Sequence, residues 1–362
     1  MKLLHVISSL ETGGAQKLVG DLLPVINSQP DIETRLIVFR KTGSPIEKTI
    51  IDKGIEIVSL ECSPKSPGAL LKLLPHLRWA DVVHAHLFPI NYQMAIANIL
   101  AGKPLVFTEH STHNRRRDKK WLRPAEKWMY SRYAAVGCIS KAVNDNLRKW
   151  IGQKTAGEKL HTIENGVDLS SFKDIQSISK EKLFGREGTA VLMISRFVDA
   201  KDQPTLIKSI AKIDDKDVFA VLVGDGPRRE EFEQLARDLG ISDRVLFLGT
   251  RSDIPDIIGA SDIGVQSSNW EGFGLTAVEM MAGGLPVIAS DVEGLKQVVE
   301  DAGLLFPKGD DDLLAEAILS LLKNKDLYSL TSQSCRKKAS AYSIERTAEV
   351  YIRLYRDLLN TI

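Results

Sequence analysis

The sequence predicts an α/β protein of two doubly wound, Rossmann-like domains, and three observations carry this prediction. The chain has 362 residues with 48 Lys and Arg against 47 Asp and Glu, which suits two domains of ~150 residues each. Short, continuous apolar runs rich in Val, Ile and Leu recur along it, as expected of strands buried on both faces of a parallel sheet. Amphipathic stretches of helical length separate these runs.

The apolar runs fall into two groups that predict one sheet each. Runs of the first group lie at 2–8, 34–39, 55–60, 81–86, 104–108 and 134–139. Runs of the second group lie at 190–195, 218–223, 245–248, 261–267 and 285–289. Helices are expected among others at 15–28, 91–101, 141–151, 202–213, 227–239, 274–283 and 311–323.

The domain boundary is expected at a polar, irregular stretch without a long apolar run. We therefore predict a first domain at 1–168, a linker at 169–188 and a second domain at 189–342. The last segment, 343–362, has apolar residues at spacings of three and four, which indicates an amphipathic helix. We expect this helix to pack back on the first domain.

Charge distribution and cysteine content indicate the kind of compartment in which the protein works. Residues 1–168 hold 24 Lys and Arg against 16 Asp and Glu, whereas 169–362 hold 24 against 31, so the halves carry +8 and −7. The three cysteines, at 62, 138 and 335, are too scattered for a disulfide framework and favour a reducing, cytoplasmic compartment. No run approaches the ~20 apolar residues of a membrane span, and the first run is too interrupted for a signal peptide.

Paired glycines follow the first predicted strand. Gly13 and Gly14 precede a helix, where backbone N–H groups and the helix dipole favour a phosphate. The same pattern also fits a tight turn without a ligand. In the second domain Arg196 leaves a strand and Lys201 precedes a helix, so both cations can converge on a diphosphate. Two solvated surface cations remain the alternative for that pair.

The segment Asn269-Trp-Glu271-Gly272-Phe273-Gly274-Leu-Thr-Ala-Val-Glu279 is the most informative of the chain. It follows a predicted strand and runs into a helix whose N-terminal amides, freed by Gly272 and Gly274, suit a phosphate. Glu279 lies about one turn inside that helix and can reach back towards the ligand. A carboxylate would repel phosphate, so its partner is expected to be a neutral diol such as ribose. Glu271 then faces the group on the distal phosphate.

These motifs resemble the retaining glycosyltransferases of family 4, also called group 1, which have the GT-B architecture. The resemblance rests on Glu271 and Glu279, on the Arg196–Lys201 pair and on Val223-Gly224-Asp-Gly-Pro227. The first half agrees in order, with Gly13-Gly14, Asp81-Val-Val-His-Ala-His86, Thr108-Glu109-His110, Ile139-Ser140 and Asn165-Gly-Val-Asp168. It covers essentially the whole chain and implies two Rossmann-like domains facing a central cleft, the first for the acceptor and the second for the donor.

By position, the resemblance implies a role for each of these residues. Arg196 and Lys201 would contact the diphosphate of a nucleotide sugar, Glu279 its ribose, and Glu271 with the Gly272-Phe273-Gly274 backbone the sugar. Further donor contacts are implied at Leu275, Thr276, Gly224, Gly13 and Gly14. His110 would lie near the transferred sugar and, with Arg196, Lys201 and Glu271, would form the catalytic set. Gln16 departs from the family, in which an acidic residue often follows the paired glycines.

Other interpretations of the chain are less favoured. His84, His86, His110 and His113 could be taken for metal ligands, but no acidic or Cys ligands accompany them, and we expect neither a metal nor a cofactor. The basic stretch Arg115–Lys120 with Trp121 fits either a basic loop before a core helix or a contact with an anionic membrane surface. No nucleic-acid-binding module is recognisable.

The function expected is therefore transfer of a sugar, of the hexosyltransferase type and without a metal, from a nucleotide-diphosphate sugar to a hydroxyl acceptor. A UDP-sugar is favoured over a GDP-sugar, and the acceptor would be a glycan or a lipid-linked glycan in cell-surface polysaccharide or glycolipid assembly. The protein would be cytoplasmic, with peripheral contact at the inner face of the membrane. The alternatives are a UDP-sugar 2-epimerase of the same architecture and a non-catalytic nucleotide-sugar-binding subunit.

Overall fold

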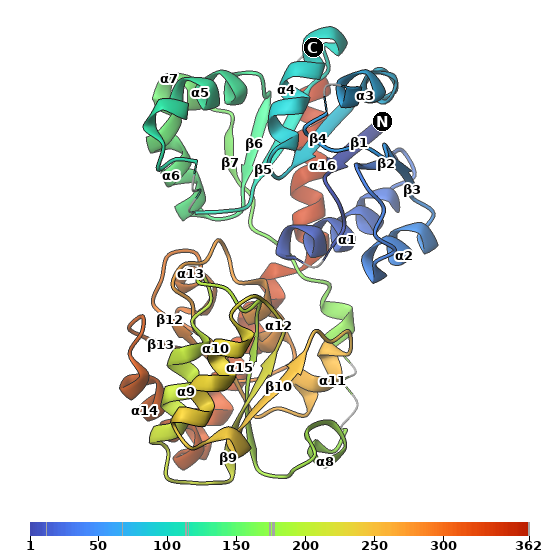
Figure 1. Ribbon diagram of the computed structural model, residues 1–362. Helices are drawn as coiled ribbons and strands as arrows, with labels where there is room; N and C mark the ends of the chain where they lie inside the picture. The colour runs from blue at the N-terminus through green and yellow to red at the C-terminus, as the bar shows by residue number, and fades with distance from the viewer. Residues whose placement is uncertain are drawn as a thin grey trace. The chain divides into compact units, whose positions relative to one another are not determined.

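The computed structural model describes residues 1–11, 13–66, 68–112, 114, 116–173, 175 and 178–360. The chain forms two compact units, Met1–Asp168 with Ile344–Ile362 and Leu169–Ser343 (Figure 1). Within the described residues each unit is built on one parallel β-sheet, and helices cover both faces of each sheet (Figure 1). This is the predicted pair of Rossmann-like domains.

The first unit holds a seven-stranded sheet in the order β3-β2-β1-β4-β5-β6-β7. Its strands are β1 (Lys2–Ile7), β2 (Glu33–Val38), β3 (Glu56–Ser59), β4 (Val82–His86), β5 (Leu105–Glu109), β6 (Ala135–Cys138) and β7 (Leu160–Thr162). Its helices are α1 (Gly14–Asn27), α2 (Pro45–Asp52), α3 (Gly68–Trp79), α4 (Ile90–Ala101), α5 (Arg123–Ser131), α6 (Lys141–Ile151), α7 (Gln153–Ala156) and α16 (Ile344–Asn360). The winding direction reverses between β1 and β4.

The second unit holds a six-stranded sheet in the order β10-β9-β8-β11-β12-β13. Its strands are β8 (Thr189–Ile194), β9 (Val218–Val223), β10 (Val245–Gly249), β11 (Ile263–Gln266), β12 (Val287–Ser290) and β13 (Leu304–Phe306). Its helices are α8 (Lys180–Phe184), α9 (Gln203–Lys212), α10 (Arg229–Asp238), α11 (Ile254–Gly259), α12 (Leu275–Ala282), α13 (Lys296–Val299), α14 (Asp311–Lys323) and α15 (Lys325–Ala339). Here the winding reverses between β8 and β11.

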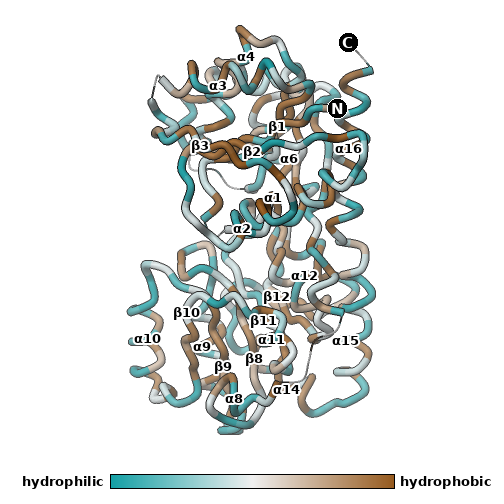
Figure 2. Tube along the Cα trace, turned by 90° about the vertical axis from the view of Figure 1, so that its right-hand side faces the viewer, coloured by the Kyte–Doolittle hydropathy of each residue, from teal (hydrophilic) through white to brown (hydrophobic). Residues whose placement is uncertain are grey.

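Burial of the strands on both faces explains their continuous apolar sequences. Five of the six residues of β1 and all six of β9 are buried. Stretches of brown, the colour of hydrophobic residues, run through both units in Figure 2. Because each buried Val, Leu or Ile contributes roughly 1.5–3 kcal/mol, the two sheets form the cores of their units. None of the helices that the described ranges contain has the length and apolar character needed to cross a bilayer.

The C-terminal helix α16 joins the core of the first unit although it lies far away in sequence. Its apolar stripe packs against Leu3 of β1 and Leu18 of α1. Tyr351 and Tyr355 are fully enclosed. Gly137 of β6 permits this close packing, since a Cβ there would lie 2.6 Å from the Tyr351 hydroxyl oxygen. The helix adds three basic and three acidic residues, so the net charge of each unit stays at +8 and −7.

The segment 169–188 differs from the linker that its polar composition suggests. Compact packing assigns the chain from Leu169 onwards to the second unit, and a 3-10 turn at Leu169–Phe172 lies against α12. In α8 the Lys180 ammonium donates to the Asp262 carboxylate at 2.6 Å and to the Gly188 carbonyl at 2.7 Å. Polar side chains here anchor the segment to the sheet, which composition alone does not distinguish from a solvated linker.

A fully buried arginine, Arg244, connects chain segments at the amino ends of β9 and β10. Arg244 donates three hydrogen bonds, to the carbonyl oxygens of Val218 at 2.9 Å and of Ile213 and Asp215 at 3.0 Å each. Burial lowers the pKa of this guanidinium, but each of its three nitrogens donates to a carbonyl.

We expect Arg244→Ala to lower the free energy of unfolding by about 2–4 kcal/mol, because the buried carbonyls of Val218 and Ile213 each lose a donor. Urea unfolding of the two proteins measures this difference. Arg237→Ala removes an exposed arginine of α10 and should change the value by less than about 0.5 kcal/mol. Equal effects of the two substitutions would show that the buried bonds of Arg244 contribute nothing.

Candidate active site

The carboxyl edge of the second sheet brings together the residues that the sequence singles out there. Lys201 follows β8 and Glu271 follows β11, the two strands at which the winding reverses. Chain segments leave such a switch point in opposite directions and open a crevice at the sheet edge. Main-chain bonds join the two loops: the N–H of Asn269 donates to the Ala200 carbonyl at 2.9 Å, and Lys201 bridges to Ser268.

Lys201 and Glu271 form an ion pair across this switch point. Only 19% of the Lys201 side chain and 16% of the Glu271 side chain are exposed, so solvent screens the pair less than a surface pair. The other carboxylate oxygen of Glu271 accepts from the Gly272 N–H at 3.0 Å. Arg196 lies exposed at the tip of β8. Its carbonyl accepts from the Gln203 amide at 3.0 Å, which fixes the turn.

Helix α12 begins beside this pair. Its N-cap, Gly274, has φ of +100°, and a Cβ there would lie 2.7 Å from the Leu295 side chain, so glycine is needed at this turn. The first amides of the helix, including those of Leu275 and Thr276, lack acceptors within it. Glu279 follows Leu275 by four residues and so lies on the same side of the helix, where it is 6% exposed. A phosphate and a diol could therefore be bound side by side.

The Phe273 side chain points away from this edge. It is 2% exposed and packs edge-on against Tyr342, with ring centroids 5.3 Å apart. Only the main chain of Phe273 is therefore available to a ligand, as the resemblance implies. Sequence reasoning missed Gly294, where a Cβ would lie 2.5 Å from the Glu271 carbonyl oxygen. Its signal was a glycine in the segment that follows β12.

Gly224 lies at the end of β9 and closes the turn beside Arg196. Its φ is +127°, and a Cβ would lie 2.0 Å from the Ser195 carbonyl oxygen. Its N–H donates to the Gly249 carbonyl at 2.8 Å, so the ends of β8, β9 and β10 are linked. The loop that follows β10 contains an Arg251–Asp253 ion pair.

In the first unit, Gly13 and Gly14 stand at the N-terminus of α1, as expected. Gly13 is in extended conformation, and a Cβ would lie 2.4 Å from the Gln16 amide oxygen. The Gln16 side chain therefore folds back over the turn that the glycines make. Gln16, the residue that departs from the family, thus occupies the space beside Gly13.

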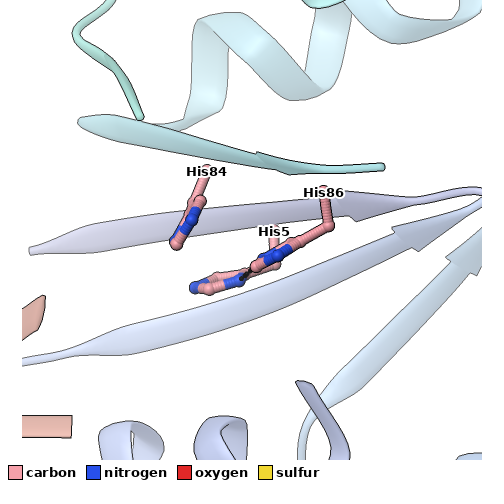
Figure 3. A group of neighbouring side chains, drawn as sticks. All are labelled: His5, His84 and His86. Carbon is pink, nitrogen blue, oxygen red and sulfur yellow. Dashed lines mark hydrogen bonds between the residues drawn. The ribbon is translucent and has the colours of Figure 1, made fainter. Parts of the chain in front are cut away.

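A cluster of buried histidines lies at the switch point of the first sheet (Figure 3). It comprises His5 of β1 and His84 and His86 of β4, all fully buried. The Nδ1 atom of His5 lies 3.0 Å from Nε2 of His86, and Nδ1 of His86 lies 3.4 Å from Nε2 of His110. Burial lowers the pKa of His5 to about 3 and of His110 to about 4, so these rings are neutral at pH 7.

His84 belongs to a second set of contacts, with helix α16. Its Nδ1 lies 2.6 Å from the Tyr355 hydroxyl and its Nε2 2.7 Å from the Thr108 hydroxyl, which is 2.8 Å from the Tyr351 hydroxyl. One nitrogen from each of His5, His84 and His86 lies within 4.8 Å of the others, a spacing that a metal ion could use. Both nitrogens of His84 are already bonded to hydroxyls, so a metal would have to displace one of them.

Two family models match the chain and together span most of it. "Glycosyltransferase Family 4" matches residues 12–171, and "Glycosyl transferases group 1" matches residues 174–340. The UDP-Gal:alpha-D-GlcNAc-diphosphoundecaprenol alpha-1,3-galactosyltransferase of Escherichia coli is 30% identical over 320 residues, 83% of this chain and 81% of that protein. The chain belongs to the group 1 glycosyltransferases of family 4.

Other similar proteins agree with this assignment. The putative glycosyltransferase EpsD of Bacillus subtilis is 30% identical over 294 residues, which is 76% of this chain and 76% of that protein. The crystal structure of Anabaena HepE in complex with UDP and glucose superposes with a TM-score of 0.87 over 99% of this chain and all of that one, at 23% identity. The glycosyltransferase thus has the two-domain GT-B fold, and the two relatives from Escherichia coli and Bacillus subtilis bear the names of transferases rather than epimerases.

The basic segment of the glycosyltransferase contains both inward-facing and exposed cations. Arg117 donates to Glu109 at 2.9 Å, and Arg116 donates to the fully buried Glu126 at 3.1 Å. These two cations therefore point into the unit rather than towards a membrane. Lys119 and Lys120 are exposed, as is 74% of Trp121. Arg115 and His113 lie outside the described residues.

Proposed function

We propose that this glycosyltransferase transfers a hexose from a nucleotide-diphosphate sugar, with UDP as the favoured nucleotide, to a hydroxyl of a glycan or lipid-linked acceptor. The anomeric configuration of the sugar is retained and no metal takes part. The product belongs to cell-surface polysaccharide or glycolipid assembly. The names of the Escherichia coli relative and of the HepE complex support the donor class.

One observation carries the proposal: Lys201 and Glu271 meet at the switch point, next to the N-terminus of α12. The Lys201 ammonium, the Arg196 guanidinium and the amides after Gly274 supply the positive charge that a departing diphosphate requires. Glu279 accepts hydrogen bonds from the ribose hydroxyls. Glu271 keeps Lys201 in place and, with the Gly272 main chain, contacts the sugar.

The reaction breaks the bond between the sugar C1 atom and the diphosphate oxygen, and the electron pair stays on that oxygen. The acceptor hydroxyl oxygen forms its bond to C1 on the face that the diphosphate leaves. The acceptor proton passes to the leaving phosphate oxygen, so the enzyme needs no nucleophile. His110 contacts the transferred sugar and helps to place C1 towards the acceptor.

Donor binding should be visible as stabilisation. A UDP-sugar at 100 times its dissociation constant adds about 2.7 kcal/mol to the free energy of unfolding and raises Tm. Thermal-shift measurements with UDP-, GDP- and ADP-sugars check this, and we expect the largest shift with UDP-sugars. Because side-chain cations neutralise the diphosphate, the shift should persist in EDTA. Loss of the shift on chelation would contradict the metal-independent part of the proposal.

We also propose that the first unit, which would bind the acceptor, contacts an anionic membrane through the exposed Lys119, Lys120 and Trp121. The net charge of +8 on the first unit supports this, and each cation near such a surface contributes about 1 kcal/mol.

Lys119→Ala combined with Lys120→Ala should weaken binding to vesicles of anionic phospholipid by about tenfold or more, and added salt should weaken binding of the unmodified protein. Co-sedimentation measures both effects. Lys48→Ala with Lys53→Ala removes two other exposed cations of the first unit and should weaken binding less. Equal loss in both double variants would leave only a non-specific charge attraction.

A further inference from the structure

Three histidines form a row across neighbouring strands of the first sheet and end at His110. His5 lies on β1, His86 is the last residue of β4, and His110 directly follows β5. The Nδ1 atom of His5 is 3.0 Å from Nε2 of His86 (Figure 3), and Nδ1 of His86 is 3.4 Å from Nε2 of His110. His5 and His86 are fully buried, whereas His110 is partly exposed.

The row can carry its hydrogens in only two ways. Burial lowers the pKa of all three histidines, so each ring is neutral and has one N–H. If His86 donates through Nε2, its hydrogen bond runs to Nδ1 of His5, and His110 donates through Nε2 to His86. Both bonds then point inward, towards His5, and His5 must carry its hydrogen on Nε2. If His86 donates through Nδ1, both bonds point outward, and His110 must carry its hydrogen on Nδ1.

The inner end of the row decides between these two arrangements. Nε2 of His5 is buried and has no hydrogen-bond partner among the residues that the structure describes. The inward arrangement would leave an N–H group there without an acceptor, whereas the outward arrangement leaves only a lone pair. Orphaned N–H groups are the rarer case in protein interiors, because an unpaired buried donor loses its hydration without compensation.

We propose that His5 and His86 are positioning residues that hold His110 in the tautomer with its hydrogen on Nδ1. The inward nitrogen of His110 is then occupied as an acceptor, and its other nitrogen is a donor. The two nitrogens of an imidazole point in divergent directions, so this donor faces away from His86. This step rests on the proposed contact of His110 with the transferred sugar. In that contact, Nδ1 of His110 donates a hydrogen bond to a sugar oxygen.

The tautomer can be measured directly in the unmodified protein. Long-range proton–nitrogen spectra of histidine-labelled protein distinguish a protonated from an unprotonated ring nitrogen, and His110→Gln identifies the His110 signals. We expect a protonated Nδ1 and an unprotonated Nε2 at His110, opposite to the tautomer that a free imidazole side chain prefers. A protonated Nε2 at neutral pH overturns the inference, whatever the activity of the enzyme.

Variants test whether the row sets this tautomer. His5→Phe replaces the donor to His86 with an aromatic ring, which can only accept an N–H contact from Nε2 of His86. The inward arrangement is then favoured, so His110 should shift towards the Nε2 tautomer and kcat should fall by roughly tenfold, with KM for the donor little changed. His5→Gln retains an amide donor and should restore part of both signals. His84→Phe is the control, because His84 is equally buried but bonds to Tyr355 and Thr108 instead.

The failures of this inference and of the proposed function can be told apart. If His84→Phe shifts the His110 tautomer as much as His5→Phe does, the row has no special role and the positioning claim is overturned. If His110→Gln transfers sugar at the full rate, the proposed sugar contact of His110 is wrong, although its tautomer is still set by the row. Should His5→Phe fail to fold, the spectrum of the unmodified protein still decides.

Discussion

In the Lys201→Ala variant, sugar transfer is expected to fall by about 10³-fold. Lys201 supplies positive charge at the switch point, where negative charge grows on the diphosphate as the glycosidic bond breaks, and one such group contributes roughly 3–4 kcal/mol to catalysis. The loss should appear mainly in kcat. The protein should still fold, because the Glu271 carboxylate keeps its hydrogen bond from the Gly272 N–H and loses only one charged partner, at a cost of about 1–3 kcal/mol.

The measurement is kcat and KM for the donor in purified variants of confirmed fold. Lys208→Ala is the matched control, because Lys208 lies on α9 a few residues further along but is exposed. It should retain the full rate. If Lys201→Ala and Lys208→Ala transfer sugar equally well, Lys201 does not act on the leaving group.

Gly224→Ala is expected to destabilise the second unit by roughly 3 kcal/mol or more and to weaken UDP-sugar binding. A Cβ would lie 2.0 Å from the Ser195 carbonyl oxygen, and φ at this position, +127°, is one that other residues rarely adopt. Relief of the clash must separate β8 from β9, and Arg196 would move with the end of β8.

Urea unfolding and calorimetric titration with a UDP-sugar measure the two effects. Gly240→Ala separates their causes, because Gly240 also has positive φ, +67°, but a Cβ there meets nothing within 4 Å. The free energy of unfolding of that variant should fall by only about 1–2 kcal/mol, and it should bind the donor normally. If both variants behave alike, backbone conformation alone explains the effect and the contact with Ser195 is unimportant.

The strands show what the sequence can reveal and where it stops. Long runs such as 218–223 coincide with strands because both faces of a central strand are buried. The apolar runs do not predict β7 and β13, since each has only three residues and is partly exposed. Their places at the sheet edges follow from tertiary packing, which leaves little periodicity to recognise.

The candidate site is predictable where the chemistry is local. Gly274 and the helix after it can be placed from consecutive residues, because the turn and the helix start are encoded within a few positions. The pairing of Lys201 with Glu271 does not follow from the sequence, because it depends on β8 lying beside β11. Likewise His5 only interrupts an apolar run in the sequence, and its partner His86 becomes visible through strand register.

Charge counting is informative for whole units but not for single side chains. The +8 of the first unit remains when α16 is included. Within the basic segment, however, Arg117 is neutralised by Glu109, whose carboxylate also accepts a hydrogen bond from the Tyr130 hydroxyl. A run of cations in a sequence does not show which of them will find a buried partner.

The anomeric configuration of the product tests the central claim most directly. The purified protein would be supplied with an α-linked UDP-sugar and a synthetic lipid-diphosphate-linked sugar as acceptor, and the new glycoside examined by proton NMR. Attack on the face that the diphosphate leaves predicts an α-glycoside, with UDP released in equal amount. A β-glycoside, or an isomerised free sugar formed without any glycoside, would contradict the mechanism proposed for Arg196, Lys201 and Glu271.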